Sequence, residues 1–117
     1  MRSDELKSRT KKFAIDVIKL VGIFPNTKAA NIIGRQLIKS STSVGANYRS
    51  ACRAQSRAHF ISKLSIVLEE TDESQYWLEL VLVLNLAKPS RIKTLINESG
   101  ELMAIFISSI KTARKKS

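Results

Sequence analysis

The feature that most constrains the fold of this chain is its shortage of turn residues, with four glycines and two prolines among 117 residues. Domains built from short strands need a turn signal about every ten residues, which this sequence does not supply. Long uninterrupted segments favour a few long helices instead. Because 44% of the residues are apolar, one helical core can be filled. We therefore expect a single all-α domain over residues 1–117.

Apolar residues that recur every three or four positions predict four helices, over residues 4–23, 28–53, 56–86 and 90–115. The break at Phe24-Pro25-Asn26-Thr27 separates the first two helices and offers Asn26 or Thr27 as an N-cap. Ser56 is the expected N-cap of the third helix. Short connections between long helices place neighbours antiparallel, so the predicted fold is an antiparallel up-down-up-down four-helix bundle.

One stripe of each predicted helix is expected to face the core. In the first helix the stripe is Leu6, Thr10, Phe13, Val17, Leu20 and Phe24, and in the second it is Ala29, Ile33, Leu37, Ser40, Val44, Asn47 and Ala51. In the third it is Phe60, Leu64, Val67, Thr71, Leu78, Leu82 and Asn85, and in the fourth Ile92, Leu95, Ile96, Leu102, Met103, Phe106 and Ile110. Polar residues at core positions predict a hydrogen-bonded layer between the two central helices, with a ligand pocket as the alternative. These residues are Gln36, Ser40, Asn47, Thr71 and Ser74.

The charges are unbalanced, because 20 lysines and arginines face 10 acids and the net charge is +10. Such an excess attracts polyanions, nucleic acid first and an anionic membrane second, and a bundle that is merely basic is the alternative. On a helical wheel, five basic residues of the second helix fall within about 80° of each other. This basic face consists of Lys28, Arg35, Lys39, Arg49 and Arg53. Further attraction is expected from Lys11, Lys12, Lys111, Arg114, Lys115 and Lys116.

The third predicted helix carries more apolar surface than one core stripe needs. Residues 69–79 hold five of the ten acids and no base, and most of these acids point away from the core with Tyr76. A second apolar ridge of Ile66, Trp77, Leu80 and Leu84 flanks the acids, which predicts an interface between subunits. The expected interface residues are Ile66, Glu69, Glu73, Trp77, Leu80 and Leu84. The basic face then either binds phosphates or pairs with this acidic face of a neighbour in a closed ring.

The sequence offers no pattern for catalysis, a metal or a cofactor. His59 has no second histidine or cysteine ligand nearby in the sequence, and the carboxylates of residues 69–73 lack the histidine partners of a di-metal bundle. Cys52, although it lies among arginines, is expected to be a small packing residue. One cysteine fits a reducing cytoplasm, the charged N-terminus does not resemble a secretory signal, and no segment is long enough to span a membrane. We expect a non-enzymatic cytoplasmic binding protein.

Residues 33–80 carry a specific resemblance to a known family. The matching residues are Arg35-Gln36-Leu37, Ser43-Val44-Gly45-Ala46-Asn47, Phe60, Glu70 and Trp77-Leu78-Glu79. With them the chain resembles the four-helix-bundle proteins related to the bacterial 23S rRNA-intervening-sequence proteins, from Lys11 to Arg114. Many relatives carry Glu-Gly shortly after the asparagine, where this chain has Ser50-Ala51, so it resembles a variant branch.

The resemblance implies a left-handed antiparallel four-helix bundle without enzymatic activity. It also implies a homopentameric ring, as in several relatives, some of which are encoded inside ribosomal RNA genes. A related group serves diversity-generating retroelements as accessory proteins and binds nucleic acid and a reverse transcriptase. The expected partners are therefore other copies of the chain, RNA or DNA, or a partner protein, without a membrane.

Overall fold

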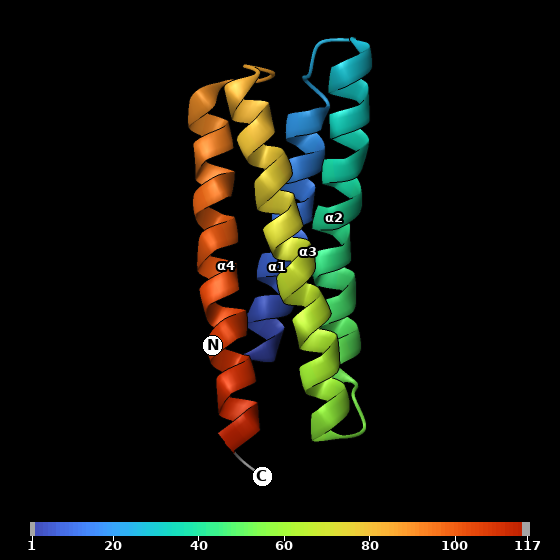
Figure 1. The fold of residues 1–117 in the computed structure, drawn as a ribbon, viewed down its shortest axis with the longest axis vertical. Helices are drawn as coiled ribbons and strands as arrows, with labels where there is room; N and C mark the ends of the chain where they lie inside the picture. Colours follow the sequence, from blue (N-terminus) through green and yellow to red (C-terminus); the bar gives the residue numbers. More distant parts are fainter. Residues whose placement is uncertain (1, 116–117) are drawn as a thin grey trace.

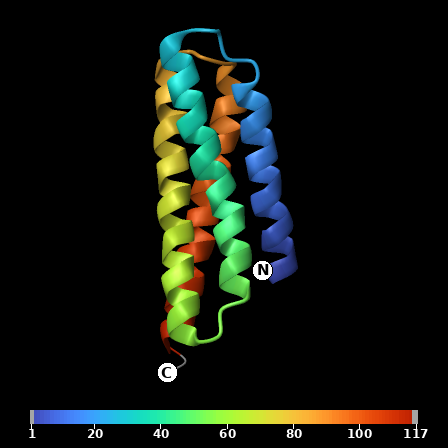
Figure 2. The same ribbon diagram turned by 90° about the vertical axis from the view of Figure 1, so that its right-hand side faces the viewer.

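The computed structural model describes residues 2–115, which form four helices in an up-down-up-down arrangement (Figures 1 and 2). The helices are α1 (Ser3–Val21), α2 (Lys28–Cys52), α3 (Arg57–Val83) and α4 (Pro89–Lys115). They run along the long axis of a body of 49 × 21 × 20 Å, and no strand occurs within residues 2–115. The expected all-α antiparallel four-helix bundle is confirmed, and the expected helix ends differ from the observed ones by at most three residues.

α2 and α3 begin where a polar side chain accepts a hydrogen bond from one of the first free backbone N–H groups. The Ala30 N–H donates to Thr27 Oγ1 at 3.2 Å at the start of α2, and the His59 N–H donates to Ser56 Oγ at 3.0 Å at the start of α3. Thr27 and Ser56 are thus the N-caps. Pro89 opens α4, where a missing N–H and a fixed φ fit the first turn.

The C-terminus of α3 corrects the sequence-based prediction for Asn85. This residue was expected on the core stripe of a helix reaching residue 86, but it is exposed and has a φ of 55°. Its left-handed backbone lets the Leu86 N–H donate to the Val81 carbonyl at 3.1 Å and the Asn85 N–H donate to the Leu82 carbonyl at 3.2 Å. This is a Schellman termination, and asparagine tolerates its conformation better than most residues.

The core follows the predicted stripes closely. Phe13, Leu37, Leu78 and Phe106 are almost completely buried, as are most other residues expected inside. The prediction for Ala29 was wrong, because Ala29 is exposed and Ala30 is buried instead. α2 contacts both α1 and α3, so its buried arc is wider than a single stripe and includes Ala30 and Ser41.

The four helices form a square in which α2 packs against α1 and α3, α4 packs against α3, and α1 and α4 contact each other least. Two glycines of α2 face α1. A Cβ atom at Gly34 would lie 2.7 Å from Val21 Cγ1, and one at Gly45 would lie 3.3 Å from Thr10 Oγ1. These glycines lower the helix propensity of α2, and in return they let α1 approach closely.

The predicted polar layer exists but has other members than expected. Ser74 Oγ donates to Ser40 Oγ at 2.9 Å between α3 and α2, as predicted. Thr71 and Asn47 instead donate to carbonyls of their own helices, Val67 and Ser43. The layer continues on the far side of α3, where Gln75 Nε2 donates to Ser99 Oγ of α4 at 3.0 Å. Within residues 2–115 no buried side-chain nitrogen or oxygen lacks a hydrogen-bond partner.

The glycines allow a direct test of the α1–α2 contact. Gly100 lies within α4, where a Cβ atom would meet only Gln75 Nε2 at an ordinary 3.8 Å. Gly100→Ala should therefore raise the free energy of unfolding by about 0.5–1 kcal/mol through helix propensity. Gly34→Ala should lower it, because the new methyl group collides with Val21. Urea denaturation of both variants checks this, and an equal gain at the two sites would contradict the close packing of α1 on α2.

Candidate interaction surfaces

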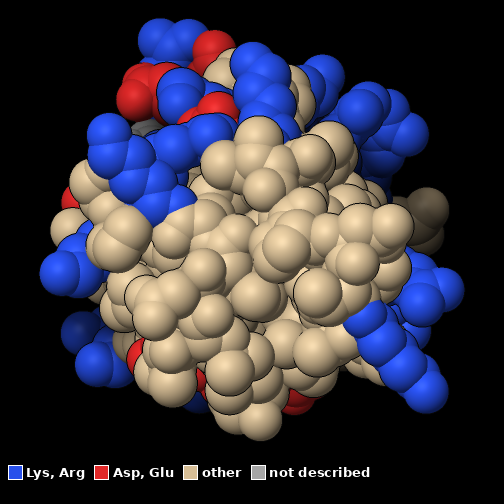
Figure 3. Space-filling model, turned by 90° about the horizontal axis from the view of Figure 1, so that it is seen from above, with Lys and Arg blue, Asp and Glu red and all other residues tan. Residues whose placement is uncertain are grey.

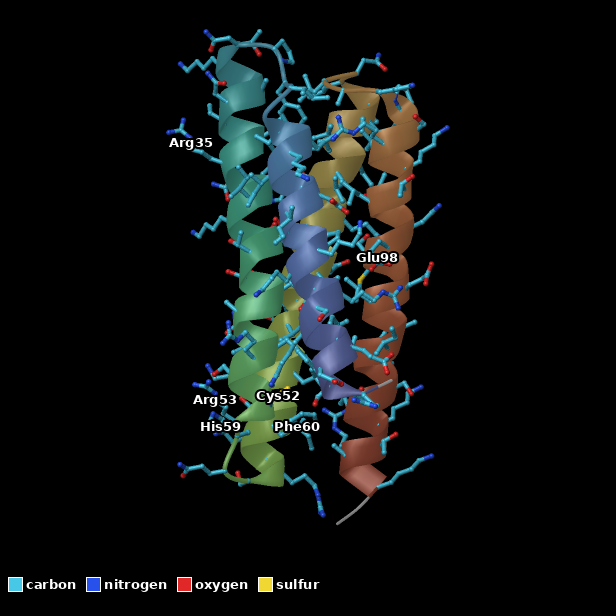
Figure 4. All side chains as sticks on the ribbon, turned by 180° about the vertical axis from the view of Figure 1, so that it is seen from behind. Arg35, Cys52, Arg53, His59, Phe60 and Glu98 are labelled. Carbon is cyan, nitrogen blue, oxygen red and sulfur yellow. The ribbon has the colours of Figure 1, made fainter. Side chains whose placement is uncertain are left out.

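The five residues of the predicted basic face all lie exposed on α2 or at its end. Lys28, Arg35, Lys39 and Arg49 lie on the outer side of the helix, and Arg53 is its C-cap. In Figure 4, Arg35 and Arg53 project away from the bundle near opposite ends of α2. The face therefore extends along the length of the molecule and points into solvent.

None of these five side chains forms an ion pair within residues 2–115. The ion pairs of this part of the chain are Arg2–Asp4, Lys12–Asp16 and the pairs of Arg9 with Glu98 and Glu101. The acids at positions 69–79 are likewise absent from these pairs. The basic face of α2 and the acidic face of α3 thus form no ion pair within the described part of the protomer.

The two flanks of α1 differ in charge. On the side of α4, a hollow of about 460 Å³ is lined by Arg9, Lys12 and Asp16 of α1 and by Glu98 and Glu101 of α4, among others. Arg9 donates to Glu98 at 2.7 Å through two nitrogens and to Glu101 at 2.8 Å. The hydrogen bonds to Glu98 raise the pKa of the Arg9 guanidinium above its usual range. Lys12, which was expected to attract polyanions, is paired with Asp16. The cations of α1 that line this hollow, Arg9 and Lys12, are thus both paired with acids.

The flank of α1 that faces α2 is different. A hollow of about 230 Å³ lies between the N-terminal half of α1 and the C-terminal end of α2, and no acid lines it. Its lining residues are Lys7, Ser8, Lys11, Arg49 and Arg53. Two residues of the predicted basic face thus share a recess with two lysines of α1. The sequence predicted Lys11 only as a general source of attraction and did not single out Lys7.

The opposite end of the molecule is less charged at its centre. Seen along the long axis in Figure 3, the end that carries the α1–α2 and α3–α4 connections shows uncharged side chains in the middle and charged ones around the rim, with more lysines and arginines than acids. Ile23 and Leu84 belong to these connections and are 54% and 49% exposed. The end therefore offers apolar contact surface rather than a recess of converging cations.

The outer surface of α3 combines acids with apolar side chains. Glu69, Asp72, Glu73 and Glu79 are exposed, as is Tyr76, and Ile66 is 39% exposed. Trp77 and Leu80 are half-buried. Trp77 Nε1 donates to Glu73 Oε2 at 3.3 Å, and its ring meets Tyr76 edge to face at 5.1 Å. Trp77 also packs against the core cluster, so the predicted ridge is partly continuous with the core.

Within residues 2–115 the sequence-based prediction missed six large exposed apolar residues, which are Ile15, Ile18, Ile23, Ile32, Val83 and Ile107. Ile32 is 45% exposed on α2 between Lys28 and Arg35, and Val83 is 75% exposed at the end of α3. The sequence could have indicated the exposure of Ile32, because Ile32 follows Lys28 by about one helical turn and therefore lies on the same outer side of the helix. The upper half of the basic face therefore has an apolar centre.

The residues considered for catalysis or metal binding do not converge within the described chain. His59 is exposed near the lower end of α3 (Figure 4). Cys52 is half-buried against the core, in agreement with a packing role. Burial, with a smaller effect of Cys52, raises the pKa of Tyr48 above its usual range, so Tyr48 stays protonated. Residues 2–115 contain no group of three or more histidine, cysteine or acidic side chains placed to hold a metal ion, and none of their helices is long and apolar enough to cross a membrane.

The sequence profile of a known family covers most of this bundle. The family is described as 23S rRNA-intervening sequence protein, and its profile matches residues 3–108. The chain belongs to this family. The resemblance noted in residues 33–80 is thereby confirmed, and the matched range includes α1, α2, α3 and most of α4.

A solved structure shares the fold of this family member. It is a crystal structure of a protein from Bacteroides thetaiotaomicron, described as a protein with unknown function from the S23 ribosomal protein family. It is 36% identical, superposes with a TM-score of 0.86, and the similarity covers 95% of this chain and 99% of that one. A search of curated proteins gives no match to the chain.

Trp77 provides a test of whether the outer surface of α3 is an interface. Large half-buried aromatic residues beside acids and other apolar side chains commonly anchor subunit contacts. Trp77→Ala should reduce the size of the assembly, measured by light scattering, more than it reduces helicity, measured by circular dichroism. Ile18→Ala is the control, because Ile18 is a 45% exposed apolar residue of α1, away from the outer surface of α3. Loss of helicity with an unchanged assembly would identify Trp77 as a core residue only.

Proposed function

We propose that this chain is a non-enzymatic, oligomeric four-helix-bundle protein that binds nucleic acid through the basic face of α2. The observation that carries the proposal is the set of five exposed cations on α2, none of which is paired with an acid within residues 2–115. Unpaired lysines and arginines on one side of a basic protein attract polyanions and release counterions when they meet phosphate. The chain acts as one domain and needs no cofactor or metal.

RNA is the first nucleic acid to consider. The family description refers to 23S rRNA, and the description of the Bacteroides structure refers to a ribosomal protein family. The chemistry of the basic face favours contacts with phosphate over recognition of base sequence, because aromatic residues make up only 6% of the chain and none lies on that face. DNA would satisfy the same contacts. A bacterial cytoplasmic setting fits both partners and the single cysteine.

Assembly is the second part of the proposal. The acidic and apolar surface of α3 complements the upper part of α2, where Ile32 lies among Lys28, Arg35 and Lys39. A heterologous contact between these unlike surfaces closes into a ring when the rotation between subunits permits it, and a homopentamer is the proposed state. The proposed contact residues on α3 are Ile66, Glu69, Glu73, Trp77, Leu80 and Leu84.

The two roles can occupy different halves of α2. Lys39 and Arg49 are ten residues apart in the sequence, a rise of about 15 Å along a helix, and Thr42, Ser43 and Ala46 on this side between them carry no charge. The upper half has Ile32 at its centre, as expected for a protein contact. The lower half, with Arg49 and Arg53, shares its hollow only with cations and Ser8, as expected for phosphate.

The alternative function is that of a scaffold or accessory subunit. In this case the entire basic face pairs with the acidic face of a neighbour or with a partner protein, and no nucleic acid binds. The unpaired acids of α3 favour this alternative, because a single protein contact would pair the charges of the basic face with those of the acidic face.

The size of the assembly is the first test. The exposed apolar side chains of α2 and α3 predict several subunits per particle at micromolar concentration, with five as the expected number. Light scattering coupled to size exclusion measures this mass directly. A stable monomer of 13.1 kDa at these concentrations would contradict the ring.

A pair of charge reversals separates nucleic-acid binding from assembly. Arg49→Glu with Arg53→Glu should reduce the slope of log affinity for single-stranded RNA against log salt by about 0.7 for each lost phosphate contact. Arg35→Glu with Lys39→Glu changes the net charge equally, but it should dissociate the assembly, because these residues face the acids of a neighbour. Glu69→Lys with Glu73→Lys should restore that assembly.

The charge-reversal experiment has one control, and two outcomes would contradict the proposal. Circular dichroism verifies that each variant remains helical. Binding of one sequence at high salt while others are ignored would contradict electrostatic contact with phosphate. The absence of binding to any RNA or DNA at low salt would exclude nucleic acid as the partner and favour the scaffold.

A further inference from the structure

The hollow between α1 and α2 has the chemistry of a site for one phosphate group. Its volume is about 230 Å³, and it is lined by Lys7, Ser8, Lys11, Arg49 and Arg53. The antiparallel arrangement places the N-terminal half of α1 beside the C-terminal end of α2. Because Lys7 and Lys11 are four residues apart, and Arg49 and Arg53 are also four residues apart, each helix presents a pair of cations to the same recess.

The four cations are not compensated by acids within the described residues. None of them takes part in an ion pair in residues 2–115. Asp4 precedes Lys7 by about one turn of α1, and its carboxylate accepts hydrogen bonds from Arg2 at 2.8 and 3.2 Å. Arg2 is the main cause that lowers the pKa of Asp4, and Lys7 adds a smaller contribution. The hollow thus keeps an excess of positive charge.

The other flank of α1 shows that this excess is local. There Arg9 is bound by Glu98 and Glu101, and Lys12 by Asp16. Lys7, Lys11, Arg49 and Arg53 are exposed and line one recess without an acid, so an anion that enters the recess would relieve the repulsion between them. Guanidinium groups bind phosphate oxygens through two N–H donors, ammonium groups add point charges, and the Ser8 hydroxyl adds a neutral donor.

We propose that Lys7, Ser8, Lys11, Arg49 and Arg53 form a phosphate-binding site at the α1–α2 seam. The proposal deepens the proposed function, because it assigns a defined site to one phosphate of the nucleic acid. That phosphate is either a phosphodiester within the strand or a phosphomonoester at its end. A terminal phosphate carries a larger negative charge than a diester, so it suits a recess lined by four cations more closely.

The first experiment uses inorganic phosphate and no nucleic acid. The amide resonances of the assembled protein are followed by NMR as sodium phosphate replaces sodium chloride at constant ionic strength. The expected result is that the largest shifts occur at Lys7, Ser8, Lys11, Arg49 and Arg53. Shifts spread evenly over the exposed lysines and arginines would overturn the site, whether or not nucleic acid binds.

The second experiment identifies the source of the phosphate. A short single-stranded RNA with a 5′-phosphate is compared with the same RNA carrying a 5′-hydroxyl, in wild type and in Lys7→Ala with Lys11→Ala. Lys88→Ala with Lys93→Ala is the matched control, because it removes the same charge from exposed residues at the far end of the bundle. Circular dichroism checks that the exposed substitutions leave the helices intact.

The outcomes distinguish a terminal phosphate from a backbone phosphodiester, and they test the phosphate site separately from nucleic-acid binding. A preference for the 5′-phosphate that disappears in Lys7→Ala with Lys11→Ala and survives in the control assigns the site to a strand end. Equal weakening of both RNAs, with the salt slope reduced by about 0.7 per contact, assigns it to the strand backbone. An equal loss of RNA affinity in Lys7→Ala with Lys11→Ala and in the control would overturn the site, although it would still agree with nucleic-acid binding. Localised phosphate shifts without RNA binding would support the site and contradict the proposed function.

Discussion

Two glycines of α2 set the distance between α1 and α2, and much of the surface chemistry depends on this distance. At Gly34 even a methyl group would collide with Val21, and Gly45 lies against Thr10, which is completely buried. Lys7 lies about one turn before Thr10 and Arg49 about one turn after Gly45, so in this antiparallel pair both lie toward the same end of the bundle. The close contact therefore brings the cations of α1 alongside those of α2 and makes a recess from two pairs of residues that are far apart in the sequence.

The distribution of charge follows from which neighbour each helix face meets. α1 has cations on both flanks, and on the side of α4 they are bound by acids while on the side of α2 they are not. α3 has the reverse imbalance, because four of its five acids are exposed and none of the five forms an ion pair within the described residues. A protomer that separates opposite charges in this way gives up electrostatic stability that pairing would supply. The separation favours contacts outside the protomer, with other subunits and with phosphate.

The sequence predicted the elements of this fold well because their signals are local. Thr27 and Ser56 mark helix starts, and the apolar repeats determine which side of each helix is buried. The end of α3 was missed because the left-handed conformation of Asn85 leaves no hydrophobic signal. The hollow was missed in part because it depends on the rotation of α1 relative to α2, which no single helix encodes. Arg49 and Arg53 were therefore predicted as binding residues while their partner Lys7 was not.

The apolar pattern of α3 shows why a helix with little amphipathic character can still be informative. The other three helices concentrate apolar residues on one side, but those of α3 are spread around its circumference. Its inner residues, which include Leu64, Val67, Leu78 and Val81, are completely buried, whereas Ile66 and Val83 are 39% and 75% exposed, so α3 carries apolar surface beyond what faces the core. Trp77 links the buried and the exposed sides of α3, since it packs against the core and also donates a hydrogen bond to the exposed Glu73. A contact made through Trp77 would therefore be coupled to the core, and assembly through this surface would stabilise the fold of each protomer.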